Sequence, residues 1–134
     1  MAEAADRLDE LVRVAHDART RAYAPYSEFT VGAAVLAGGN VYSGCNVENA
    51  SYGLSICAER VAATTAVAAG ERRIDAVAVV GSADRPTPPC GACRQFLYEF
   101  GPTMTVAVET PDGRREVWRL DEILPHAFGP DFLA

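Results

Sequence analysis

The spacing of apolar residues along the chain predicts an amphipathic helix followed by a β-hairpin. In the first segment apolar side chains recur at helical spacing, at Leu8, Leu11, Val12, Ala15 and Ala18. Because this pattern ends before Pro25, it predicts a helix over residues 4–22. Apolar residues then alternate along residues 29–37, and the Gly-Gly-Asn sequence at 38–40 supplies a turn before a second extended stretch at 41–45.

Helical and extended segments continue to alternate in the rest of the chain. Residues 58–69 are dense in helix formers, and Gly70 follows where a C-terminal cap belongs. The remaining segments are an apolar strand at 74–80, a helix over 91–100 that ends at Gly101, and two strands at 103–109 and 114–120 joined by a turn at 110–113.

The predicted order is helix, strand, strand, helix, strand, helix, strand, strand, in one domain over residues 1–134. We expect an α/β fold, a three-layer α-β-α sandwich around a mixed five-stranded sheet whose central strands are parallel. The Pro-rich stretch 85–89 is interpreted as a loop. Sheets of this type place reactive groups beside the starts of the helices that follow their strands, and Cys57 and Cys90 occupy such positions.

Composition and charge exclude several classes of function. Hydrophobic residues make up 49% of the chain and charged residues 22%, and no apolar run reaches the ~18 residues of a membrane span. We therefore expect a soluble globular protein with no membrane partner. The chain has 12 arginines and no lysine, which excludes Schiff-base chemistry and a Walker A loop. Its net charge of −6 makes nucleic acid an unsuitable partner.

The cysteines carry the candidate chemistry. The first residues include acids and no apolar signal region, so we expect a cytoplasmic protein whose cysteines are metal ligands or free thiols. Two residues separate Cys90 from Cys93, a spacing that lets both thiolates bind one zinc ion, and Cys57 can supply a third sulfur. Three protein ligands leave one coordination position open, as in a catalytic site. Glu59, two residues after Cys57, is placed to reach that position without binding the metal.

Two other classes of protein share parts of this pattern. The Cys90–Cys93 pair alone is also typical of a thiol-disulfide redox motif at a helix start, but that interpretation gives Cys57 and Glu59 no purpose. A structural zinc module with Cys45 as the fourth ligand would not need Glu59 either. Otherwise Cys45 is expected to be a buried strand thiol.

Taken together, the motifs resemble the zinc-dependent cytidine deaminases of the small homotetrameric type, with a three-cysteine zinc site. The resemblance covers nearly the whole chain, at residues 26–34, 44–50, 57–60, 89–95 and 127–130. Zinc deaminases use either one histidine and two cysteines or three cysteines on the metal, with a glutamate that is not a ligand.

The resemblance implies a role for each matching residue. Cys57, Cys90 and Cys93 would bind one Zn²⁺ per chain, and Glu59 would transfer the protons of the reaction. Asn46 and Glu48 would hold the ribose 3′-hydroxyl, and Phe29 would pack on the pyrimidine. The family pattern also places Ala50, Tyr52, Ala58 and Phe128 at the substrate, with Ala50 and Tyr52 coming from an adjacent subunit of a homotetramer whose active sites lie at subunit interfaces.

Three thiolates around Zn²⁺ leave a formal charge of −1, which weakens the effect of the metal on water. Compensating positive charge is therefore needed. The helix starts at Cys57 and Cys90 supply part of it. We expect Arg60, and also Arg94, to donate hydrogen bonds to the sulfurs.

The expected reaction is the hydrolytic deamination of free cytidine and 2′-deoxycytidine to uridine and 2′-deoxyuridine, with release of ammonia, as in pyrimidine salvage. The competing substrate within this type of enzyme is a nucleoside-like antibiotic, as in blasticidin-type deaminases. The ending at residues 127–130 argues against that alternative.

Overall fold

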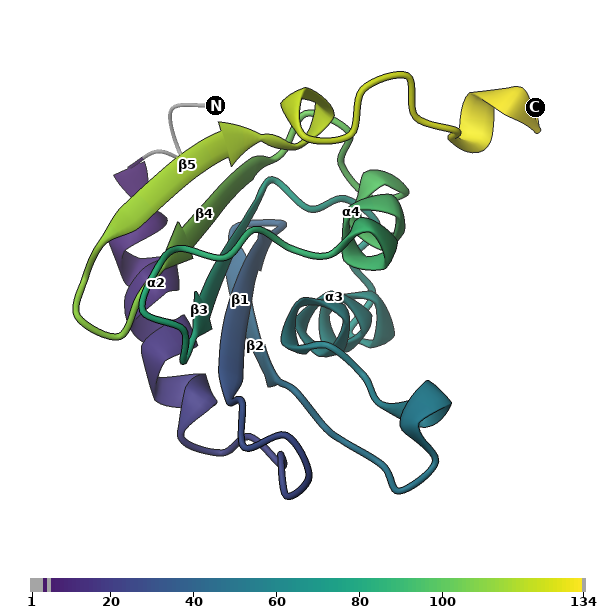
Figure 1. The fold of residues 1–134 in the computed structure, drawn as a ribbon. Helices are drawn as coiled ribbons and strands as arrows, with labels where there is room; N and C mark the ends of the chain where they lie inside the picture. The colour runs from purple at the N-terminus through teal and green to yellow at the C-terminus, as the bar shows by residue number, and fades with distance from the viewer. Residues whose placement is uncertain (1–3, 5, 134) are drawn as a thin grey trace.

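The computed structural model describes residue 4 and residues 6–133, which form one sheet with helices on both sides (Figure 1). The three longer helices are α2 (Leu8–Arg19), α3 (Ala58–Ala68) and α4 (Gly91–Tyr98). The five strands are β1 (Val31–Ala37), β2 (Asn40–Cys45), β3 (Ala76–Gly81), β4 (Thr105–Glu109) and β5 (Arg115–Arg119). Short 3₁₀ helices at Tyr52–Leu54, Leu120–Glu122 and Pro130–Phe132 complete the described elements.

The element order is the predicted one, and most bounds agree within two or three residues. The first helix is shorter than expected at both ends, and residue 5 of the predicted range lies outside the described residues. Ile74 precedes β3 rather than opening it, but its side chain is fully buried and its N–H donates to the Phe100 carbonyl at 2.9 Å.

The strand order is β2-β1-β3-β4-β5, which confirms a mixed five-stranded sheet. Only β3 and β4 are parallel, so the expectation of parallel central strands is correct for this pair and wrong for β1 and β3. The physical reason is that β1 lies between β2 and β3. A crossover through α3 brings β3 into the sheet in the same direction as β2, and both strands are therefore antiparallel to β1.

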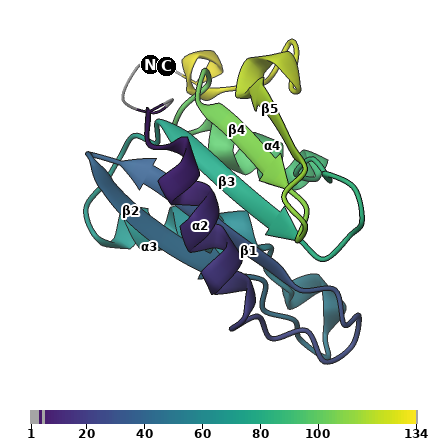
Figure 2. The same cartoon turned by 90° about the vertical axis from the view of Figure 1, so that its left-hand side faces the viewer.

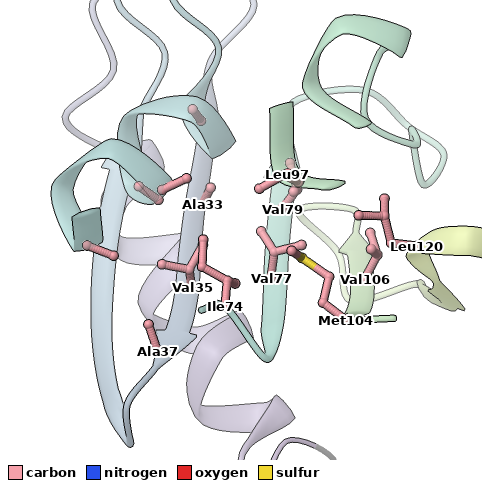
Figure 3. Close-up of a cluster of buried hydrophobic side chains, with 14 of the residues drawn as sticks. Ala33, Val35, Ala37, Ile74, Val77, Val79, Leu97, Met104, Val106 and Leu120 are labelled. Carbon is pink, nitrogen blue, oxygen red and sulfur yellow. The ribbon is translucent and has the colours of Figure 1, made fainter. Parts of the chain in front are cut away.

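The two faces of the sheet bury separate cores. Figure 2 shows α2 lying across one face, where Leu11 and Ala15 pack with Leu36 and Ala78. On the other face α3 and α4 cover alternate residues of the same strands. Figure 3 shows this second core, where Leu97 of α4 faces the sheet together with Val77, Val79, Val106, Met104 and Leu120. Because successive strand residues point to opposite faces, the apolar runs of β1 and β3 serve both cores.

Glycine allows each covering helix to approach the sheet closely. A Cβ atom at Gly32 of β1 would collide with the Ala15 carbonyl of α2, and one at Gly44 of β2 would collide with backbone atoms of Ala58 and Ala62 in α3. The second contact fixes the first turn of α3 against the hairpin. Since Cys57 directly precedes this turn, the packing also fixes the position of that cysteine.

Candidate metal centre and substrate pocket

The starts of α3 and α4 bring three cysteines together. Cys57 is the N-cap residue of α3, Cys90 is the N-cap residue of α4, and Cys93 lies in the first turn of α4. All three sulfurs lie within 4.8 Å of one another, and those of Cys90 and Cys93 are 3.4 Å apart. Zinc–sulfur bonds of about 2.3 Å require this kind of spacing. The sulfurs therefore fit one zinc ion, as the sequence predicted.

The charge state of the cluster also suits a cation. A hydrogen bond from Cys93 and the nearby guanidinium of Arg60 lower the pKa of Cys57 to about 5, so this thiol is a thiolate at neutral pH. The same hydrogen bond, together with burial, raises the pKa of Cys93. A thiolate at a helix N-terminus, as at the partly buried Cys57, is a ready ligand for Zn²⁺.

Cys45 takes no part in this cluster. It is the last residue of β2, and its thiol donates to the Arg21 carbonyl, with 3.4 Å between sulfur and oxygen. Cys45 is only partly buried, so the expectation of a buried thiol is wrong, because the strand ends here and one side of the residue reaches the surface. The group of metal-ligating residues found among the described residues contains Cys57, Cys90 and Cys93 only. This arrangement disfavours a structural zinc module with Cys45 as fourth ligand, and the convergence of Cys57 on the other two sulfurs disfavours a simple redox pair.

The two arginines expected to contact the sulfurs differ. Arg60 Nη2 lies 3.8 Å from Cys57 Sγ and 3.4 Å from the Ser55 carbonyl oxygen. Arg94 instead donates to two backbone carbonyls, from Nε to Pro89 at 2.7 Å and from Nη1 to Ile123 at 2.6 Å. The expectation of a sulfur contact is therefore confirmed for Arg60 and wrong for Arg94. Arg94 is drawn away because the loop before Cys90 leaves a backbone carbonyl that needs a donor.

Glu59 is a buried carboxyl group beside the cysteines. Only 5% of the residue is exposed, and it lines the same cavity as Cys57 and Cys90. Burial, reinforced by the negative charge of Cys57, raises its pKa to about 7. A carboxyl group with a pKa near neutrality both accepts and donates protons efficiently. It lies in the first turn of α3, two residues after Cys57, and it is not part of the three-cysteine cluster found among the described residues.

The cavity has a volume of about 420 Å³, which falls in the range of sites for small molecules. Five of the predicted substrate or proton-transfer residues line it, namely Phe29, Asn46, Glu48, Ala58 and Glu59. Phe29 lies across the end of β3, where its ring is 3.3 Å from the position that a Cβ of Gly81 would take. This glycine therefore leaves the space that the aromatic ring occupies.

Asn46 fixes one wall of the cavity through its side-chain amide. Its Oδ1 accepts the N–H of Val31 at 2.8 Å, and its Nδ2 donates to the Phe29 carbonyl at 2.8 Å. The amide thus continues the pairing of β1 with the segment after β2. One N–H and one acceptor site of Asn46 remain for a ligand.

Glu48 lies at the mouth of the cavity and is held by the preceding loop. Its Oε1 accepts the backbone N–H groups of Tyr26 at 3.0 Å and Ser27 at 3.1 Å, and its Oε2 accepts the Ser27 hydroxyl. The Ser27 hydroxyl and these backbone donors lower the pKa of Glu48. The residue is consequently an ionised acceptor at neutral pH.

Three predicted substrate residues do not line the cavity of their own chain. Ala50 is exposed, Tyr52 is 75% exposed and Phe128 is 56% exposed. The ring of Tyr52 packs against that of Tyr26, with 6.0 Å between the ring centroids. Phe128 stacks on Phe132 near the C-terminus, where Gln95 of α4 donates to the Phe128 carbonyl at 2.8 Å.

The cavity also has lining residues that the sequence analysis did not single out. They are Ser27, Val31, Ser55, Ile56, Val79, Gly81, Thr87, Pro88 and Pro89. The proline-rich stretch was interpreted only as a loop, although its position directly before Cys90 was a signal that it borders the metal site. Ser27 lies inside the matching segment 26–34, but nothing in the sequence shows that its hydroxyl contacts Glu48.

Comparison with known families relates most of the chain to one group of enzymes. The family model described as "cytidine and deoxycytidylate deaminase zinc-binding region" matches residues 5–109. The chain is 48% identical to a cytidine deaminase of Halalkalibacterium halodurans over 120 residues, which cover 88% of this chain and 91% of that protein. It is 44% identical to a cytidine deaminase of Mycobacterium tuberculosis over 89% of this chain and 87% of that protein.

Solved structures give the same relationship. The crystal structure of a cytidine deaminase from Burkholderia pseudomallei superposes with a TM-score of 0.86 and 50% sequence identity, over 90% of this chain and 98% of that one. A cytidine deaminase from Bacillus anthracis, at 18% identity, has a TM-score of 0.70 and supports the fold alone. No helix in the described part of this chain is both long and apolar enough to cross a membrane.

Proposed function

Because the chain belongs to the cytidine and deoxycytidylate deaminase family, we propose that residues 1–134 form one catalytic domain that hydrolyses free cytidine and 2′-deoxycytidine. The products are uridine or 2′-deoxyuridine and ammonia, as in pyrimidine salvage. The observation that carries this proposal is the buried carboxyl group of Glu59, which opens into the same cavity as the three-cysteine cluster.

The chemistry is divided between the metal and Glu59. Cys57, Cys90 and Cys93 would hold a zinc ion, which when bound would acidify water and so supply a nucleophile at neutral pH. Glu59 would take up one proton of the water and deliver it to N3 of cytosine as the oxygen bonds to C4. It would then take the remaining proton of that oxygen and deliver it to the amino group, which leaves as ammonia when its bond to C4 breaks. A pKa of about 7 suits both steps, because neither uptake nor release of the proton is strongly uphill.

The remaining cavity residues bind and orient the nucleoside. Phe29 offers an apolar ring surface for the pyrimidine. Asn46 and Glu48 offer polar groups for a sugar hydroxyl, with the 3′-hydroxyl as the expected partner. Ala58 lines the cavity beside Cys57, and its backbone lies at the start of α3 where N–H groups are not used within the helix.

We also propose a homotetramer in which neighbouring subunits complete each site. Tyr52 and Phe128 are exposed aromatic residues that the family pattern places at the substrate, yet neither lines the cavity of its own chain. Further large apolar side chains are exposed in the chain segments that also contribute lining residues to the cavity, namely Tyr23, Tyr26, Val47, Leu54 and Ile56. An exposed apolar surface of this kind is typical of a subunit interface.

Charge favours a free nucleoside over phosphorylated or polymeric substrates. Glu48 is ionised and lies where the sugar hydroxyl would bind, so a 3′-phosphate would be repelled. The chain has a net charge of −6, and polynucleotide binding requires basic surfaces. Since zinc binding needs reduced thiols, we place the protein in the cytoplasm.

The experiment compares kcat/KM for three substrates: cytidine, cytidine 3′-monophosphate and a cytosine-containing single-stranded oligonucleotide. The loss of ultraviolet absorbance measures deamination in each case. Cytidine is expected to be the best substrate by a wide margin. Equal or faster turnover of either phosphorylated substrate would overturn the proposed substrate class. The zinc site would then serve the deamination of that phosphorylated substrate instead of a free nucleoside.

A further inference from the structure

The hydroxyl group of Ser27 connects two residues of the cavity that face different parts of a nucleoside. Its Oγ accepts the backbone N–H of Phe29 at 3.0 Å and donates to Oε2 of Glu48. A serine hydroxyl has a single hydrogen to donate. Because the N–H of Phe29 can only donate and the ionised Glu48 can only accept, the direction of both hydrogen bonds is fixed.

These contacts limit how many further donors Glu48 can accept. Its two oxygens offer about four acceptor positions in all. The backbone N–H groups of Tyr26 and Ser27 occupy two positions on Oε1, and the Ser27 hydroxyl occupies one on Oε2. One position on Oε2 remains, which is enough for a single hydroxyl group of a ligand.

The loop that carries Ser27 has a backbone conformation that needs support. Glu28 has φ of 60°, in the left-handed region that residues with a side chain seldom adopt, and its N–H donates to the Ala24 carbonyl at 3.0 Å. Ser27 supports the backbone on both sides of Glu28. Its backbone N–H and its hydroxyl group donate to Glu48, and its Oγ accepts the N–H of Phe29, the residue after Glu28.

We propose that Ser27 is a positioning residue that aims the free acceptor position of Glu48 at one sugar hydroxyl while it holds Phe29 for the base. This inference rests on the proposed function, because it takes a nucleoside as the ligand. Ser27 acts through its hydrogen bonds to Glu48 and Phe29. The hydrogen bond to Glu48 is the one that determines recognition of the sugar hydroxyl.

The test compares Ser27→Ala with the matched control Ser27→Thr, which keeps a hydroxyl at the same position. Residue 27 is exposed, so the extra methyl group has room. Ser27→Ala is expected to lower kcat/KM for cytidine by roughly 10- to 100-fold, the range for losing a hydrogen bond to a charged group, mainly through KM. The decrease should be much smaller for 3′-deoxycytidine, which lacks the hydroxyl that Glu48 accepts. Ser27→Thr should keep most of the activity on cytidine.

A second measurement does not depend on turnover. The Glu48 carboxyl group can be titrated by nuclear magnetic resonance in the zinc-loaded protein, with and without the Ser27 hydroxyl. Ser27→Ala should raise the pKa of Glu48, because a donor that favours the ionised form is lost, and Ser27→Thr should leave it unchanged.

The outcomes separate this inference from the proposed function. If wild-type protein deaminates cytidine but Ser27→Ala loses the same factor on cytidine and 3′-deoxycytidine, Ser27 has a general packing role and the inference is overturned. An unchanged Glu48 pKa in Ser27→Ala overturns it as well. If wild-type protein does not deaminate cytidine, the proposed function fails together with the nucleoside part of the inference, while the titration still decides whether Ser27 positions Glu48.

Discussion

The guanidinium of Arg60 reaches back along the first turn of α3 to Cys57, with 3.8 Å between Nη2 and Sγ. The same Nη2 atom also donates to the Ser55 carbonyl at 3.4 Å, and the buried Nε has no hydrogen-bond partner among the described residues. Three thiolates and one Zn²⁺ carry a formal charge of −1. We therefore expect Arg60, which lies beside Cys57 on α3, to offset this excess charge.

Replacing Arg60 with glutamine is expected to weaken zinc binding by roughly 10- to 100-fold, the usual effect of removing a group that supports a metal ligand. Competition with a chromophoric chelator measures the affinity. Arg94→Gln is the matched control, since the hydrogen bonds of Arg94 within the described residues go to the backbone carbonyls of Pro89 and Ile123. It should reduce thermal stability with little effect on zinc affinity. Wild-type zinc affinity in Arg60→Gln would refute the charge-compensation argument.

Each of the three clustered cysteines is expected to be essential for the metal. Cys57→Ala should abolish both zinc content and deamination, because two remaining sulfurs hold zinc too weakly. Cys45→Ser provides the control, since this thiol lies outside the cluster. Metal analysis and an ultraviolet assay on cytidine measure the two effects. A full zinc content in Cys57→Ala would remove that residue from the ligand set.

Glu59→Gln should separate proton transfer from metal binding. Glutamine has nearly the same size and does not carry the buried charge, so the fold and the zinc content should remain. The variant should lose at least ~10²–10⁴ in kcat, as expected when a general acid–base group is removed. Circular dichroism and metal analysis serve as controls beside the rate measurement. Near-normal turnover would show that Glu59 does not carry the protons.

Deleting residues 127–134 should raise KM or weaken assembly. The deletion removes Phe128, whose ring lies outside the cavity of its own chain and is expected to serve a neighbouring one. Phe128→Ala tests the ring alone, because the backbone carbonyl that accepts from Gln95 is retained. Light scattering at the concentration of the assay reports the oligomeric state. A fully active monomer would contradict the shared-site proposal.

Acid stability should depend on Glu109, which joins α2 to the end of β4. Its Oε2 lies 2.6 Å from His16 Nε2, and its Oε1 accepts Arg115 Nε at 2.8 Å. Burial opposes ionisation of Glu109, but the hydrogen bonds from His16 and Arg115 outweigh it and lower the pKa. The stabilisation is therefore present above the unfolded-state pKa, about 4.3, and is lost as pH falls through the lower folded-state value.

Glu109→Gln should lower the free energy of unfolding at pH 7 by about 1.5–3 kcal/mol, the range for hydrogen bonds to a charged group. Its stability should also fall less steeply below about pH 5 than that of the wild type. Denaturant titrations at several pH values measure both effects. Glu116→Gln, at an exposed position on neighbouring β5, should change neither. Parallel pH profiles of wild type and Glu109→Gln would rule out a role for Glu109 in acid stability.

Local patterns in the sequence were sufficient to predict the elements and the clustering of the three cysteines. The apolar runs define β1 and β3 because each strand is buried on both faces, and Gly70 and Gly101 follow the ends of α3 and α4. The spacing of Cys90 and Cys93 is a local property of one helix turn. Cys57 could be added because it also directly precedes a helix, and helices on one face of a sheet can bring their starts together.

Features that depend on distant backbone groups could not be predicted in this way. The antiparallel pairing of β1 with β3 depends on which side of the hairpin the crossover enters. The partners of Arg94 depend on carbonyl groups that the loop before Cys90 and the residues near Ile123 leave available. The position of Phe128 outside the cavity likewise depends on the path of the C-terminal segment along α4, which Gln95 helps to fix.

The origin of the three sulfurs constrains how the protein matures. Cys57 belongs to the crossover between β2 and β3, whereas Cys90 and Cys93 belong to the crossover between β3 and β4. The β1–β2 hairpin can form locally, but pairing of β1 with β3 must close a long loop that includes α3, a slow kind of step. The cysteines meet only after both crossovers have docked on the sheet. We therefore expect the complete three-cysteine site to form only after the sheet has assembled, so that zinc binds a chain already folded around the site.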